Sequence, residues 1–124
     1  MIHIGFSILH ALVAQFYSLL VEVRNMINGK QRSYLKSLAQ AIDATVYIGK
    51  EDLTDNIISE MDRYLDVHEL VKVKIQENCL LDPKETANKC AGILKAEFVQ
   101  AIGRKFVLYR PAAEAINRNI VLPK

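Results

Sequence analysis

Apolar residues recur at the spacing of one helical face in three stretches of this 124-residue chain. The first covers residues 30–42, the second follows Thr54 and ends near residue 68, and the third follows Asp82 and ends near residue 94. In each stretch the apolar positions lie three or four residues apart, which is typical of an amphipathic helix with one buried side. Three helices are therefore predicted in this part of the chain.

Four shorter runs rich in β-branched and aromatic residues predict strands. They cover residues 44–48, 70–76, 98–102 and 106–109. The second run alternates strictly, so its valines share one face of the strand. Lys72 and Lys74 fall on the opposite face, which we expect to be open to solvent.

Two helix starts carry capping signals. Thr54 is placed to cap the second helix, and Asp82 is placed to cap the third, with Pro83 at the first helical position. Glu85 follows at the position from which its side chain can return a capping-box contact to Asp82. These signals predict helices that begin at residues 55 and 83.

The element order is therefore α-β-α-β-α-β-β, which predicts an α/β fold of the α+β-like kind. Each strand-helix-strand passage favours parallel strands, and the last two strands favour an antiparallel hairpin. The expected result is a mixed four-stranded sheet with helices packed on it. If the helices covered only one face of this sheet, the other face would display Lys72 and Lys74.

Residues 1–25 form an apolar extension, and the domain proper is expected to span residues 26–124. Three interpretations stay open: an upstream start codon assigned in error, a packed or partner-binding helix, or a membrane anchor. The anchor is disfavoured, because no lysine or arginine precedes the apolar run and its length is near the lower limit for a membrane span.

The composition argues against most catalytic and metal-binding classes. Cys79 and Cys90 lack the close pairing and histidine companions of a zinc site, so reduced structural thiols are expected. No nucleophile elbow, phosphate-binding loop, dinucleotide fingerprint or metalloprotease helix occurs. A non-enzymatic protein without a cofactor is predicted, and the cysteines are consistent with a cytoplasmic location.

The net charge is only +2, so any affinity for nucleic acid must come from the arrangement of the cations. Gly103, Arg104 and Lys105 interrupt two predicted strands, where they form either an ordinary hairpin turn or a basic corner suited to phosphate. The candidate RNA-binding residues are Gly103, Arg104, Lys105, Lys50, Lys72, Lys74, Lys30, Arg32, Lys36 and Arg110.

Four blocks of sequence, in order, resemble a known family. They are KQRSYLKSLA at 30–39, VYIGKEDLTDNI at 46–57, HELVKVKI at 68–75 and VQAIGRKFVLYRP at 99–111. Together they are similar to the bacterial YhbY family of single CRM domains, a class named for chloroplast RNA splicing and ribosome maturation. The resemblance implies a fold like the C-terminal domain of translation initiation factor three, RNA binding, and no catalytic activity or cofactor.

Many CRM domains carry a G-x-x-G loop. The resemblance aligns it here with residues 103–106, where Phe106 replaces the second glycine. With a single glycine, we expect the side chains of Arg104 and Lys105 to hold phosphate more than the bare backbone does. Tyr109 is expected to be buried, with base stacking as the alternative.

The resulting hypothesis is a non-enzymatic protein that binds precursor RNA of the large ribosomal subunit during ribosome assembly, with no small-molecule substrate. The alternative is an interaction adaptor, tethered to a membrane through the apolar N-terminus, that binds acidic protein or anionic lipid. The RNA element and the oligomeric state stay open.

Overall fold

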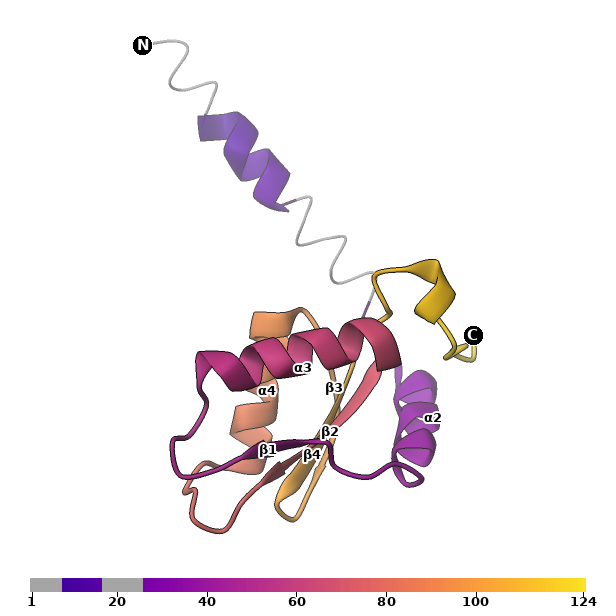
Figure 1. Ribbon diagram of the computed structural model, residues 1–124. Helices are drawn as coiled ribbons and strands as arrows, with labels where there is room; N and C mark the ends of the chain where they lie inside the picture. Colours follow the sequence, from indigo (N-terminus) through magenta and orange to yellow (C-terminus); the bar gives the residue numbers. More distant parts are fainter. Residues whose placement is uncertain (1–7, 17–25) are drawn as a thin grey trace.

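The computed structural model describes residues 8–16 and 26–124 (Figure 1). From residue 26 onward the chain forms helices and strands in the predicted order. The elements are α2 (Gly29–Ala39), β1 (Val46–Ile48), α3 (Asp55–His68), β2 (Leu70–Ile75), α4 (Pro83–Leu94), β3 (Glu97–Ile102), β4 (Lys105–Tyr109) and the short 3-10 helix η1 (Ala115–Asn117). The α+β fold with a mixed four-stranded sheet is thereby confirmed.

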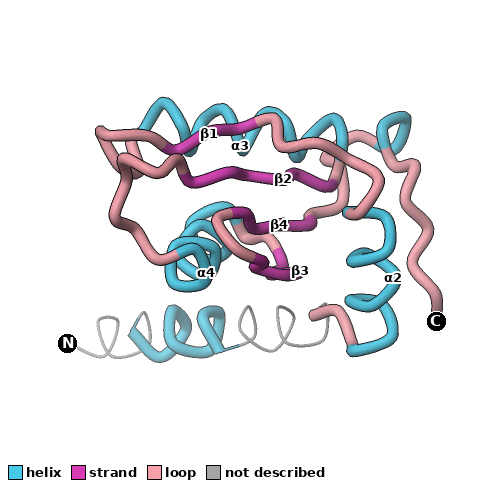
Figure 2. Tube along the Cα trace, turned by 90° about the horizontal axis from the view of Figure 1, so that it is seen from below, coloured by secondary structure: helices cyan, strands magenta, loops and turns pink. Residues whose placement is uncertain are grey.

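The strands lie in the order β1-β2-β4-β3 (Figure 2). β1 and β2 are parallel, and β4 is antiparallel to both of its neighbours, β2 and β3. The register shifts between Phe98 and Gln100, where β3 contains a bulge. The last two strands form the predicted hairpin, and β4 fills the place between β2 and β3.

One face of the sheet carries the main core under α3 and α4. The valines of β2 point to this face, as their alternation predicted, and they pack with Met61, Leu65 and Cys90 from the two helices. Phe106 and Leu108 of β4 complete the centre and are fully buried. The two helices therefore seal this side of the sheet.

The opposite face is covered only in part, by α2. Leu35 and Ala39 of this helix pack on Val99, Val107 and Tyr109 of the sheet. In Figure 2, α2 lies away from α4, at one end of the sheet. The part of this face that α2 does not cover carries Lys74, which is exposed as expected. Lys72, expected on the same open face, is only half exposed, because α2 covers part of this face and the ammonium group of Lys72 bonds to the carbonyl of Ile42.

Three side chains cap the helices. Thr54 and Asp82 accept from the backbone N–H groups of Ile57 and Glu85, as predicted. The reciprocal capping box expected at Glu85 is not formed, since the bonds described for that helix start include none from its side chain. The box forms instead at α2, where Asn28 and Gln31 exchange side-chain-to-backbone bonds of 2.8 and 3.0 Å. This box was not predicted, because the apolar spacing places the start of the helix one residue later.

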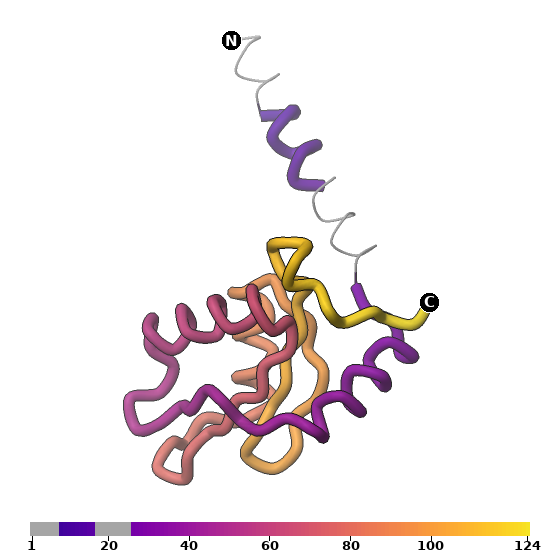
Figure 3. The backbone as a smooth tube through the Cα atoms, turned by 45° about the vertical axis from the view of Figure 1, so that its right-hand side comes forward, coloured from indigo at the N-terminus to yellow at the C-terminus, as the bar shows by residue number. Residues whose placement is uncertain are grey.

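The C-terminal tail is held by a buried carboxylate. Glu69 ends α3 in the left-handed conformation, with φ at 67°, and its side chain is only 1% exposed. Its two oxygens accept the backbone N–H groups of Ala112, Asn119 and Ile120 at 2.7 to 3.1 Å. The tail then runs on toward α2 (Figure 3), where Gln31 donates to the carbonyl of Pro123.

Residues 8–16 are helical, and their side chains are exposed. Within the two described ranges, no helix is both long enough and apolar enough to cross a membrane. The interpretations of the N-terminal extension also depend on residues 1–7 and 17–25, which lie outside the described residues.

Candidate nucleic-acid interface

A row of four residues crosses the open face of the sheet. The strand register places Tyr47 beside Lys74, Lys74 opposite Lys105, and Lys105 opposite Ile102. We call these four residues the basic row. Tyr47 is 50% exposed and Ile102 is 69% exposed, and both lysines are also exposed. The row therefore presents two cations between an aromatic and an aliphatic side chain.

The two lysines of the basic row face each other on antiparallel strands. Like charges in directly opposite positions repel and destabilise a sheet. In the part of the chain that the structure describes, neither ammonium group makes an ion pair or a hydrogen bond. An anion bound between them would relieve the repulsion, so this arrangement favours phosphate.

The aromatic side chain on this face is Tyr47. Its hydroxyl donates to the carbonyl of Ala44 at 3.1 Å, which fixes the ring on the outer side of β1. Tyr109, in contrast, is buried under α2, as expected. Burial raises the pKa of the Tyr109 hydroxyl, and the nearby carboxylate of Glu69 adds to this effect, while Arg118 opposes it. Tyr47 is thus the tyrosine of the open face that can stack on a base, and the sequence analysis did not identify it.

Arg104 makes internal bonds that the sequence analysis did not foresee. Its Nε donates to the carbonyl of Ile75 at 3.3 Å, and one terminal nitrogen donates to the carbonyls of Gln76 and Cys79. Ile75 ends β2, and Gln76 and Cys79 belong to the connection between β2 and α4. Arg104 therefore ties the hairpin to this connection, and only its other terminal nitrogen lacks a partner among the bonds described.

Three more of the candidate cations also make internal bonds. Arg110 binds Asp62 and Asp66 through ion pairs of 2.9 and 2.8 Å, and it donates to the carbonyl of Leu94. Arg32 donates to the carbonyl of Phe98 at 3.1 Å, and Lys72 donates to the carbonyl of Ile42 at 2.8 Å. Arg110 directly follows β4 and therefore links this strand to both helices of the core face. These contacts indicate a structural role for Arg110.

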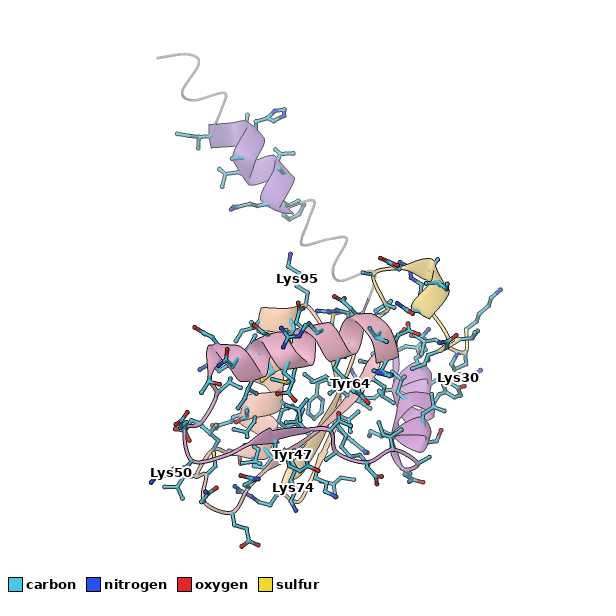
Figure 4. The ribbon with its side chains drawn as sticks, in the orientation of Figure 1. Lys30, Tyr47, Lys50, Tyr64, Lys74 and Lys95 are labelled. Carbon is cyan, nitrogen blue, oxygen red and sulfur yellow. The ribbon has the colours of Figure 1, made fainter. Side chains whose placement is uncertain are left out.

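The remaining candidate cations are exposed but spread over the surface (Figure 4). Lys30 and Lys36 lie on α2, and Lys50 lies in the loop between β1 and α3. In Figure 4, Lys74 lies close to Tyr47, whereas Lys30 and Lys50 lie on opposite sides of the domain. The structure therefore brings Lys74 and Lys105 together and leaves these three lysines apart from the row.

Comparisons with known proteins agree on one family. The model of the CRS1/YhbY (CRM) domain matches residues 27–110. The chain belongs to this family. It is 34% identical to "Probable RNA-binding protein YqeI" of Bacillus subtilis and 36% identical to "RNA-binding protein" of Haemophilus influenzae, over 79% of this chain and 100% and 96% of theirs. A solved structure from Staphylococcus aureus is 41% identical, with a TM-score of 0.67, and covers 79% of this chain and all of its own.

The structure of this CRM domain does not form the four-residue loop that was expected at residues 103–106. Only Gly103 and Arg104 form the turn between β3 and β4, and Gly103 has the positive φ, 59°, that a two-residue hairpin turn requires. Lys105 already pairs in the sheet, and Phe106 is fully buried in β4. The four residues at 103–106 therefore do not form a loop, and the missing second glycine has no consequence there.

A loop with a similar spacing lies between β1 and α3 of the CRM domain. The N–H of Asp52 donates to the carbonyl of Gly49 at 2.9 Å, and Asp52 has a φ of 60°, a conformation that favours glycine. The Sγ of Cys79 donates to Oδ1 of Asp52 at 3.2 Å. Because Arg104 holds the carbonyl of Cys79, the hairpin and the two loops form one connected corner.

The cysteines of the CRM domain are expected to react slowly. Cys79 and Cys90 are both buried and unpaired, and burial raises the pKa of the Cys90 thiol to about 11. A thiol reagent such as DTNB at pH 8 should label both residues only after unfolding, because the thiolate is the reactive form. Rapid labelling of the folded protein would contradict this.

Within residues 8–16 and 26–124, no three His, Cys, Asp or Glu side chains gather to hold a metal ion.

Proposed function

We propose that this CRM domain binds RNA, without catalysing a reaction, through the basic row on the open face of its sheet. The observation that carries the proposal is the unpaired Lys74–Lys105 couple beside Tyr47. Two ammonium groups can contact successive phosphates, and an exposed tyrosine ring can stack on a neighbouring base. The names of the two bacterial relatives, both RNA-binding proteins, support RNA as the partner.

Phosphate contacts dominate this interface in the proposal, so sequence preference is weak and salt dependence is strong. Lys50, Lys30 and Lys36 extend the positive surface for a longer RNA. Arg104, Arg32, Lys72 and Arg110 contribute mainly by holding the scaffold. We further propose that the RNA is precursor RNA of the large ribosomal subunit in the cytoplasm, which rests on the resemblance of the four sequence blocks to the YhbY family.

Replacing both row lysines tests the RNA interface. The Lys74→Ala/Lys105→Ala variant should bind a short single-stranded RNA about ten-fold more weakly at low salt, and the slope of log affinity against log salt should fall by about 1.4. Fluorescence anisotropy across a salt series measures both quantities. The matched control is Lys84→Ala/Lys89→Ala, which removes the same charge from exposed positions on α4, behind the sheet. If the two double variants lose RNA affinity equally, the loss comes from net charge alone, and the proposed interface is refuted.

Gradient sedimentation of cell extract tests the ribosomal partner. The wild-type protein should travel with large-subunit precursors and leave those fractions after nuclease treatment, and the row variant should stay at the top of the gradient. If the protein is instead found in a membrane pellet that nuclease does not release, the adaptor hypothesis replaces the ribosomal one.

A further inference from the structure

A small cavity adjoins the basic row on the same face of the sheet. It has a volume of about 190 Å³ and lies between the end of α2 and strands β2, β4 and β3. Six residues line it: Gln40, Lys72, Gln100, Ile102, Lys105 and Val107. Cofactor and drug-sized ligands occupy pockets of roughly 300–1,000 Å³, so this one is of a size for a single planar ring system.

The strand register explains the shape of this cavity. Val107 lies at the bottom of the cavity, between Lys72 on one neighbouring strand and Gln100 on the other, and is itself only 1% exposed. Neighbouring strands are about 4.8 Å apart, so the two polar walls stand roughly 10 Å from each other. Ile102, two residues after Gln100 on β3, adds an exposed apolar side chain at the edge of the cavity. A planar ring can pack against Ile102, which is 69% exposed, with the polar groups of the cavity at its edges.

The polar groups of the cavity are suited to a nucleobase. Gln40 caps the end of α2, and Gln100 stands on β3; among the bonds described, neither side-chain amide has a partner. A glutamine amide offers a donor and an acceptor side by side, which matches the donor–acceptor edge of a base. The ammonium of Lys72 is fixed by the carbonyl of Ile42 and can donate further hydrogens to a base carbonyl or ring nitrogen.

We propose that this cavity holds one unpaired nucleobase of the RNA whose phosphates contact Lys74 and Lys105. The inference rests on the proposed RNA-binding function and deepens it, because Lys105 belongs both to the cavity and to the row. The charge of the row selects a polyanion, and the two amides together with the exposed side chain of Ile102 select a base. A paired base cannot enter, since its edge is already bonded and stacked within the duplex, so the site selects single-stranded, bulged or looped RNA.

Affinity measurements with three short oligomers of equal length test the site. The oligomers are an oligoadenylate, an oligouridylate and a ribose-phosphate chain without bases. The wild-type protein should bind at least one base-containing oligomer about ten-fold more tightly than the abasic one. In a Tyr47→Ala background, which removes stacking on the open face, the Gln40→Ala/Gln100→Ala changes should abolish the remaining advantage and leave the affinity and salt slope for the abasic oligomer unchanged. Asn56→Ala removes an exposed amide from α3 and should change neither value.

The outcomes separate the two proposals. If the wild-type protein binds all oligomers equally, or if the two glutamine changes leave the remaining advantage in the Tyr47→Ala background, the nucleobase site is refuted and the phosphate interface stands. If the wild-type protein binds none of them, both proposals fall. The side-chain amide signals of Gln40 and Gln100 in NMR spectra of the wild-type protein give an answer independent of any variant. They should shift with a base-containing oligomer and stay in place with the abasic one, and unmoved signals would also refute the site.

Discussion

Replacing Glu69 by glutamine is expected to lower the free energy of unfolding by about 3 kcal/mol and to release the C-terminal tail. The carboxylate of Glu69 is buried and accepts three backbone N–H groups from residues 112–120. A glutamine side chain keeps one acceptor oxygen and turns an NH₂ group toward the remaining donors. At least one N–H of the tail then loses its partner, and the amide itself gains none.

Release of the C-terminal tail should also weaken the packing of α2. Ile120 and Leu122 pack against the cluster that contains Leu35 and Ala39, and Gln31 bonds to the tail at Pro123. Urea denaturation measures the stability, and hydrogen exchange of the amides of Ala112, Asn119 and Ile120 reports the release. Glu114→Gln, a change of the same chemistry at an exposed position of the tail, should stay within about 0.5 kcal/mol of the wild-type protein.

Backbone strain at Glu69 calls for a second control, because this residue has a positive φ. Lys95 ends α4 in the same left-handed conformation, with φ at 53°, and it is exposed. Lys95→Gly should therefore stabilise the protein by about 1 kcal/mol through relief of strain. Glu69→Gly relieves similar strain and should still destabilise, since the carboxylate is lost. If both glycine variants stabilise, the carboxylate does not hold the tail.

The features that the sequence predicted correctly are local ones. The caps at Thr54 and Asp82 depend on residues three positions apart, and the alternation of β2 depends on neighbours within one strand. The exposure of Lys74 followed from this alternation, whereas Lys72, predicted to be open to solvent for the same reason, is half-buried. Such patterns act within a turn or a strand, so they are visible in the sequence before any tertiary contact is known.

The misjudged features depend on partners far away in the chain. Arg104 and Arg110 look like free cations in the sequence, yet their partners lie 16 to 48 residues away. The pairing of Lys74 with Lys105 requires the strand order, in which β4 inserts beside β2. Tyr47 was passed over for the same reason, because its place beside Lys74 is set by the parallel pairing of β1 and β2.

Replacing Arg104 by alanine is expected to destabilise the domain by about 2 kcal/mol, whereas Lys105→Ala should leave its stability within about 0.5 kcal/mol. The guanidinium of Arg104 bonds the carbonyls of Ile75, Gln76 and Cys79, and alanine leaves all three without it. The expected loss is moderate because the site is partly exposed and water can replace some of the bonds. Lys105 makes no such bond among those described, so its removal should affect RNA affinity alone.

Three readouts separate the scaffold role of Arg104 from a phosphate contact. Urea denaturation should show the loss of stability in Arg104→Ala and also in Arg104→Lys, because a lysine cannot bridge three carbonyls in the fixed geometry of a guanidinium. Labelling of Cys79 by a thiol reagent should be faster in both variants, since this residue lies in the connection that Arg104 holds. The salt slope of RNA binding should fall in Lys105→Ala and remain near the wild-type value in Arg104→Lys. If Arg104→Ala instead keeps full stability and lowers the salt slope, its guanidinium binds phosphate as the sequence alone suggested, and the internal bonds contribute little.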